Sequence, residues 1–71
     1  MKNYLMVIEP AGTGFSAYSP DMPGCVAAGR TRTATEKRMR DAIAMHIEGM
    51  LEDGLPVPEP QSTAAYVSIA A

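Results

Sequence analysis

The chain has 71 residues, a formal net charge of −2, one cysteine and one histidine. A chain of this length forms a single domain, residues 1–71, and buries only about 60% of the surface that its unfolded form exposes. The composition excludes a disulfide framework and a Cys/His zinc site, and the mildly acidic charge argues against general nucleic-acid binding. We therefore expect no metal and no cofactor, and we expect association with another chain to supply extra stability. No long apolar run stands at the N-terminus, so neither a signal peptide nor a membrane span is expected, and the predicted setting is the cytoplasm.

A β-hairpin is predicted at the start of the chain. Residues Asn3–Glu9 form an almost continuous apolar run, which is typical of a strand covered on both faces. The turn-forming cluster Pro10–Gly14 follows, so the next strand, Phe15–Ser19, should return antiparallel. Because a single helix can cover only one face of a small sheet, the other face would be exposed in a monomer unless a second chain lies against it.

A tight turn and a third strand are predicted next. Pro20 should end the second strand, because proline has no N–H to donate to a sheet. Pro23 and Gly24 suit the two central positions of a type II turn. The short apolar run Cys25–Ala28 is predicted as the third strand, and Gly29 closes it.

Residues Thr33–Gly54 are predicted to form the one long helix. Their apolar positions recur every three or four residues, at Met39, Ala42, Ile43, Ile47, Met50 and Leu51. Thr33 lies three residues before Glu36, which is a capping-box pattern, with Thr31 as a competing N-cap. Gly54 provides a left-handed exit from the helix, and Pro56 prevents its continuation.

The region after the helix is predicted to be extended. Proline at positions 56, 58 and 60 favours a stiff, polyproline-like segment, and the last apolar run, Ala65–Ile69, is predicted as a fourth strand. The resulting fold class is α+β in the order β-β-β-α-β: a small three-stranded antiparallel meander, a right-handed crossover helix and a fourth strand. We expect that fourth strand to lie parallel beside the first.

Charge is distributed unevenly along the chain. Five of the six basic residues lie between Arg30 and Arg40, and no Lys or Arg follows Arg40. The sequence leaves two interpretations open, a solvated surface or docking patches of opposite sign. Met45 falls on the polar side of the predicted helix, which favours a binding surface there. The candidate partner-binding residues are Asp41, Met45, Glu48 and Glu52 on the helix, with Tyr4 and Met6 from the first strand.

Several motifs together resemble the HicB antitoxin family. They are Ile8-Glu9-Pro10, Gly14-Phe15-Ser16-Ala17, Ser19-Pro20-Asp21-Met22-Pro23-Gly24-Cys25, Gly29-x-Thr31, Ala42-Ile43 with His46, and Asp53-Gly54-Leu55-Pro56-Val57-Pro58-Glu59-Pro60. The resemblance covers nearly the whole chain, and its most specific parts are the Pro-Asp-x-Pro-Gly-Cys turn and the proline segment after the helix. The residues that carry it as structural motif positions are Pro20, Asp21, Pro23, Gly24, Cys25, Gly29, Thr31, Gly54, Pro56 and Pro58.

The resemblance implies a partial ribonuclease-H-like fold and a role in a toxin–antitoxin system. Members of the family bind HicA, a small mRNA-cleaving toxin with a double-stranded-RNA-binding-like fold, and block its active surface. We expect this chain to bind a HicA-like toxin and to form a homodimer or a higher homo-oligomer. Longer members carry a C-terminal DNA-binding segment, whereas this sequence stops after the fourth strand, so no direct nucleic-acid contact is expected from it.

A degenerate or active metal-dependent nuclease of the ribonuclease-H-like kind is the alternative function. Such a mechanism needs several carboxylates converging on two metal ions about 4 Å apart. Glu9 precedes a turn, and Asp41 and Glu48 fall on the polar side of the helix, so we predict no catalytic residue and no metal site. Cys25 is interpreted as a small buried residue and His46 as a histidine flanking the apolar stripe.

Overall fold

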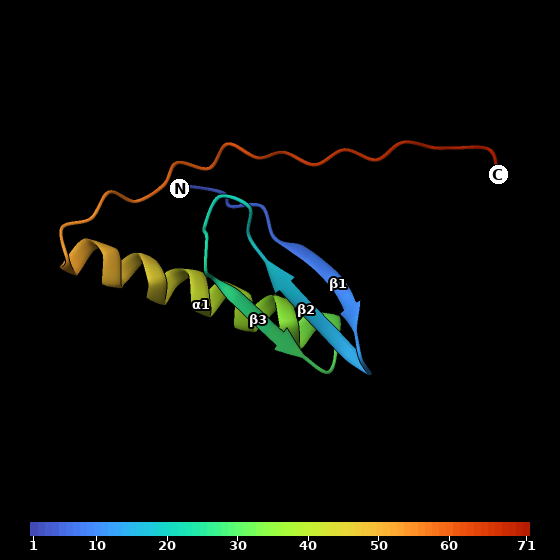
Figure 1. The fold of residues 1–71 in the computed structure, drawn as a ribbon, viewed down its shortest axis with the longest axis horizontal. Coiled ribbons are helices and arrows are strands. Elements are labelled where there is room, and N and C mark those ends of the chain that lie inside the picture. The colour runs from blue at the N-terminus through green and yellow to red at the C-terminus, as the bar shows by residue number, and fades with distance from the viewer.

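Three strands and one helix make up the regular structure. The computed structural model describes all 71 residues and contains β1 (Val7–Ala11), β2 (Gly14–Tyr18), β3 (Val26–Gly29) and α1 (Arg32–Glu52), in that order. The strands form one antiparallel sheet in the order β1-β2-β3, and α1 packs across one face of it (Figure 1). The predicted antiparallel meander followed by a helix is therefore confirmed.

The β1–β2 hairpin is closed by a two-residue loop, Gly12 and Thr13. Gly12 has a φ of 57°, whereas Thr13 has no positive φ, which is the pattern of a type II′ turn. Pairing runs from Ala11↔Gly14 to Val7↔Tyr18. The first strand thus begins later than the predicted Asn3, because its partner strand ends at Tyr18 and the chain turns away there.

The predicted type II turn after β2 is present. Gly24 has a φ of 83°, and the Cys25 N–H donates to the Met22 carbonyl at 3.2 Å. This hydrogen bond spans Pro23 and Gly24, so the two residues occupy the central positions of the turn. As a result, the turn carries Met22 and Cys25 into the protein interior.

The helix begins at the competing cap rather than at Thr33. The Thr31 hydroxyl accepts a hydrogen bond from the Ala34 N–H at 3.0 Å, as an N-cap does. Just before it, β3 passes so close to the first helical turn that a Cβ on Gly29 would lie 2.8 Å from the Thr35 hydroxyl oxygen. Only glycine fits this approach without displacing the helix.

The C-terminal end of α1 is a Schellman motif. The Leu55 N–H donates to the Met50 carbonyl at 2.9 Å, the Gly54 N–H donates to the Leu51 carbonyl at 3.2 Å, and Gly54 has a φ of 68°. The predicted left-handed exit at Gly54 is therefore confirmed. The motif also fixes the position of Leu55 beside the last turn of the helix.

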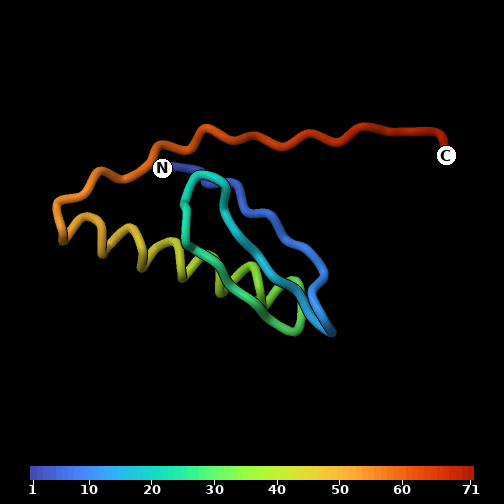
Figure 2. The backbone as a smooth tube through the Cα atoms, in the orientation of Figure 1, coloured from blue at the N-terminus to red at the C-terminus, as the bar shows by residue number.

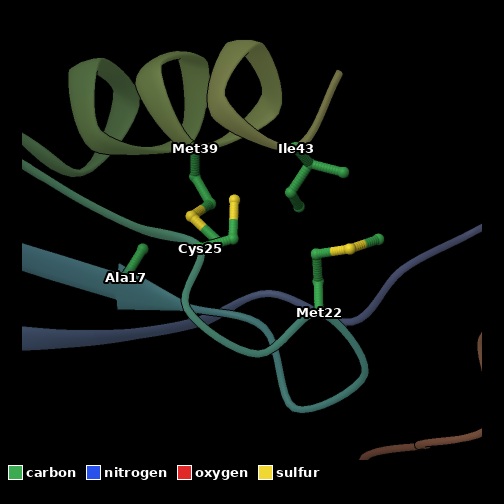
Figure 3. Close-up of a cluster of buried hydrophobic side chains, with 5 residues drawn as sticks. All are labelled: Ala17, Met22, Cys25, Met39 and Ile43. Carbon is green, nitrogen blue, oxygen red and sulfur yellow. The ribbon is translucent and has the colours of Figure 1, made fainter. Parts of the chain in front are cut away.

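The hydrophobic core is small and lies between α1 and the β2–β3 region. Met39 and Ile43 point from the helix toward residues of the strand and the turn (Figure 3). The buried apolar side chains are Ala17, Met22, Cys25, Met39 and Ile43. On the opposite face of the sheet, Tyr18 and its cross-strand partner Val26 are exposed. One helix therefore leaves one face of the sheet uncovered, as the sequence predicts for a monomer.

The prediction of a fourth strand at Ala65–Ile69 is wrong for this structure. These residues run extended along the β1 side of the molecule and past it, without entering the sheet (Figures 1 and 2). The segment is held at Gln61 and Ser62, and a cavity of about 360 Å³ separates Ala64 and Tyr66 from residues 5–8. The partial ribonuclease-H-like description, which needs that strand, stays a prediction.

Candidate functional site

One exposed face of α1 carries three of the four acidic side chains of the helix. Asp41, Met45, Glu48 and Glu52 are all exposed, and their spacing of four, three and four residues places them in one stripe. Asp41 lies 4.0 Å from the Lys37 ammonium, whereas Glu48 and Glu52 form no ion pair. The helical candidates from the sequence therefore lie together on the surface, around an apolar side chain.

A groove of about 510 Å³ runs beside this acidic stripe. It lies between the start of β3, the C-terminal half of α1 and the residues after the helix. Two apolar residues that line it, Met45 and Leu55, are exposed to 70% and 53%, and Val26 contributes at the edge of β3. Asp53 lines the same groove, so the apolar surface of the groove borders acidic side chains. We call this combined surface, the groove with Asp41, Glu48 and Glu52, the acidic groove.

Local structure explains why the groove is open. Gly24 and Gly49 line it, and a Cβ at either position would meet no atom within 4 Å. The absence of side chains at these two positions leaves space between the turn and the helix. Leu55 borders that space because the Schellman motif turns the chain back beside Met50. The turn glycine and the helix exit, both singled out as motif residues, thus shape the groove.

Tyr4 and Met6 do not belong to this surface. The Tyr4 hydroxyl donates to the Pro58 carbonyl at 2.6 Å, and the half-buried Met6 packs against the core. Lys2 forms an ion pair with Glu59 in the same region. These contacts hold the proline segment against the N-terminal residues, which gives both sequence candidates an internal role.

Asp21 has a role that sequence reasoning did not find. Its Oδ2 accepts hydrogen bonds from the Gln61 and Ser62 N–H groups at 3.0 and 2.8 Å, and its Oδ1 accepts one from the Ser62 hydroxyl at 3.0 Å. The Ser62 backbone hydrogen bond is the main reason that the pKa of Asp21 lies below its ordinary value, with the Gln61 N–H and the Ser62 hydroxyl acting in the same direction. Because Gln61 and Ser62 are about 40 residues away from Asp21 in the sequence, no local pattern indicates these hydrogen bonds. We call these three hydrogen bonds between Asp21 and residues Gln61 and Ser62 the Asp21 clasp.

The arrangement of the acidic, cysteine and histidine side chains gives no support to a catalytic centre. No three His, Cys, Asp or Glu side chains are grouped so that they could hold a metal ion. Glu9 is exposed in β1, and Asp21 is engaged by the chain after the helix. Burial raises the pKa of the Cys25 thiol, which lowers its reactivity as a nucleophile at neutral pH. His46 is half-buried at the groove wall.

Comparison with known families shows which family this chain belongs to. The family model described as "HicB_like antitoxin of bacterial toxin-antitoxin system" matches residues 4–70. The chain belongs to the HicB-like antitoxin family. The match includes the turn that holds Asp21, the acidic groove and the extended segment after Ser62, so all three are parts of the HicB-like region.

Two relatives of this HicB-like chain are informative. It is 37% identical over 65 residues to an uncharacterized 14.9 kDa protein from the rep-hol intergenic region of Haemophilus phage HP1 (strain HP1c1). The match covers 92% of this chain and 49% of the phage protein, so the chain spans about half the length of that relative. Among solved structures, a chain of a HicA3 and HicB3 toxin-antitoxin complex is similar, with 37% identity and a TM-score of 0.72 over 83% of this chain and 70% of that one.

The structure also shows that no helix has an apolar stretch long enough to span a lipid bilayer.

Replacing Asp21 by Asn should loosen the clasp in this HicB-like chain. Asparagine has one acceptor oxygen instead of two, so it cannot accept all three hydrogen bonds. We expect faster amide hydrogen exchange at Gln61 and Ser62, and a smaller change in Ser62→Ala, which removes only the hydroxyl contact. Unchanged exchange in Asp21→Asn would contradict the role of the clasp.

The clasp should also depend on pH in a defined direction. A carboxylate whose folded-state pKa is lowered stabilises the folded chain fully above its ordinary value of 3.8 and loses this contribution as pH falls through the lowered pKa. Protection of the Gln61 and Ser62 amides, corrected for intrinsic exchange, should therefore be constant at neutral and mildly acidic pH. It should fall only below the ordinary titration range of Asp.

Proposed function

We propose that this HicB-like chain is an antitoxin that neutralises a HicA-like toxin by direct protein–protein contact, with the acidic groove as its docking surface. The observation that carries the proposal is the exposure of Met45 and Leu55 at one groove, next to Glu48 and Glu52, which form no ion pair. Interfaces commonly combine such an apolar centre with a charged rim. The match to a chain of a HicA3 and HicB3 complex supports a partner of this kind.

The charge of the surface suits an RNA-cleaving partner. A protein that binds RNA presents a basic surface to the phosphates, and that surface is complementary to Asp41, Glu48 and Glu52. Opposite charges accelerate association, and this acceleration decreases with ionic strength. By covering the basic surface, the antitoxin would exclude RNA without any chemical step of its own. Such neutralisation takes place in the cytoplasm, where the mRNA is.

The shape of the surface agrees with a protein partner rather than a small molecule. The groove is open, and it continues onto the exposed face of α1 over at least three helical turns. A stable interface buries about 800 Å² on each partner. The groove together with the acidic face of the helix offers a continuous surface on which such contact is possible.

Co-expression with the product of the adjacent gene tests the proposal. We expect the two chains to co-purify, the growth arrest caused by the toxin to be relieved, and RNA cleavage by the purified toxin to stop when the chain is added. The complex should form more slowly at high salt. Failure to bind or inhibit any small basic neighbour would contradict the proposal.

The same purified chain should be tested alone for RNA cleavage with Mg²⁺ or Mn²⁺. The binding function predicts no cleavage. Metal-dependent cleavage that is lost in Glu9→Ala would favour a nuclease and overturn the proposed function.

A further inference from the structure

A second groove, of about 580 Å³, runs along α1 and shares no lining residue with the acidic groove. One of its sides is the helix, and the other is formed by the N-terminal residues together with Val57 of the proline segment. The Lys2–Glu59 ion pair and the Tyr4–Pro58 hydrogen bond hold these two segments together. We call this surface the Arg40 groove. Its lining residues on the helix are Arg40, Ile43, Ala44, Ile47 and Leu51.

Helical spacing explains why this groove is hollow and apolar. Arg40, Ala44, Ile47 and Leu51 follow one another at intervals of four, three and four residues, so they lie along one side of α1. Ala44 carries only a methyl group between larger neighbours, which leaves space above the helix. Ile47 is half-buried and Leu51 is exposed, so no segment of the chain fills that space.

The two charged side chains of the Arg40 groove are both cations, and both lie at one end of it. Lys2 and Arg40 also line a smaller cavity of about 250 Å³ that adjoins this end, whereas Leu51 lies about three helical turns away. Lys2 is paired with Glu59, but Arg40 forms neither an ion pair nor a side-chain hydrogen bond. The groove therefore has a free guanidinium at one end and only apolar side chains at the other.

The dimensions of the groove decide what kind of occupant it fits. Arg40 and Leu51 are 11 residues apart, which is roughly 16 Å along a helix. A volume of about 580 Å³ over this length corresponds to a mean width of about 6 Å, whereas a helix with its side chains is about 10 Å across. The groove therefore accepts a single alkyl chain but not a partner helix. Its volume and its apolar lining with few polar groups are also typical of small-molecule sites.

We propose that the Arg40 groove binds the anion of a long-chain fatty acid, with the carboxylate at Arg40 and the alkyl chain along Ile47 toward Leu51. The planar guanidinium can donate two parallel hydrogen bonds to a carboxylate, and no acidic side chain lines the groove to repel it. The alkyl chain removes the apolar surface of the groove from water. A free fatty acid fits better than an anionic bilayer, because the whole chain carries a net charge of −2 and would be repelled by such a surface.

Titration with dodecanoate, below the concentration at which it forms micelles, tests the site. The amide NMR signals of Ala44 and Ile47 should shift and saturate with one ligand bound per chain. Dodecylammonium, which has the same alkyl chain and a positive head group, should bind at least about tenfold more weakly. From octanoate to dodecanoate, the Kd should decrease about fourfold for each added methylene group. Equal affinities for the two head groups, or no saturable shift at Ala44 and Ile47, would overturn the proposal.

Arg40→Gln tests the role of the guanidinium. The variant should raise the Kd for dodecanoate about tenfold and leave the Kd for dodecanol unchanged, because the neutral alcohol does not depend on a positive charge. Lys37→Gln is the matched control: it removes a positive charge from the same helix outside the groove, and it should leave both Kd values unchanged. An equal effect of Arg40→Gln on both ligands, or equal effects of the two variants on dodecanoate, would overturn the assignment of the carboxylate to Arg40.

Sedimentation with phosphatidylglycerol vesicles distinguishes a free fatty acid from a membrane surface. The chain should remain in the supernatant. Co-sedimentation that is lost in Arg40→Gln would assign the groove to an anionic bilayer and overturn the proposal. Because Arg40 does not line the acidic groove, Arg40→Gln should still bind the toxin, so the outcomes for the fatty-acid site and for the antitoxin function remain separate.

Discussion

Met39→Ala is expected to destabilise this chain by about 2–5 kcal/mol. Met39 is fully buried at the centre of a core that contains only four other apolar side chains. Truncation leaves a cavity between α1 and the β2–β3 turn, and so small a core has few neighbours that can collapse into it. Because domains of this size have total stabilities near the lower end of about 5–15 kcal/mol, a large part of the protein should be unfolded at 37 °C.

Met45→Ala is the matched control for this prediction. It makes the same chemical change on the same helix, but Met45 is 70% exposed. Its effect on the free energy of unfolding should stay within about 0.5 kcal/mol. Urea denaturation at a fixed protein concentration measures both variants, since concentration affects the stability of an associating chain. Equal midpoints for the two variants would contradict the position of Met39 in the core.

Met45→Arg is expected to weaken toxin binding strongly while leaving the fold intact. The substitution removes an apolar side chain from the centre of the acidic groove and places a positive charge where a basic partner should dock. Loss of a central interface residue commonly costs about 2 kcal/mol or more, which is roughly a 30-fold increase in Kd. Calorimetric titration of the toxin into the purified variant measures this change.

Leu51→Arg provides the control on the same helix. Leu51 is also an exposed apolar residue, at 65%, but it lines a different surface, near Met1 and Val57. The Leu51→Arg variant should bind the toxin with the same Kd as the unmodified chain. If Leu51→Arg weakened binding and Met45→Arg did not, the docking surface would lie on the other flank of α1 and the assignment of the acidic groove would be wrong.

Local sequence signals predicted the parts of the fold that depend on neighbouring residues. Pro23 and Gly24 indicated the type II turn, and Gly54 indicated the helix exit, because φ preferences act over one or two residues. The spacing of Asp41, Met45, Glu48 and Glu52 placed them on one helical face, since helical periodicity needs no tertiary information. The N-cap was less certain from the sequence, because Thr31 and Thr33 are chemically equivalent candidates.

What the sequence did not predict concerns contacts between distant segments. The apolar pattern of Ala65–Ile69 indicates an extended strand but does not specify which edge the strand joins. The partner-binding role of Tyr4 and Met6 stays a prediction, and the sequence did not indicate that the Tyr4 hydroxyl donates to the Pro58 carbonyl or that Met6 packs against the core. The role of Asp21 depends on Ser62, which lies 41 residues away.

The amino-acid sequence by itself determined the antiparallel meander, the helix with its glycine exit, the acidic face of that helix and the membership of the HicB-like family. Each of these depends on dihedral preferences, on periodicity or on motifs that are contiguous along the chain. The tertiary structure decided that Met45 and Leu55 border one groove and that Ala65–Ile69 does not enter the sheet. Both depend on hydrogen bonds and packing between segments far apart in the sequence, whose energies have no local signature.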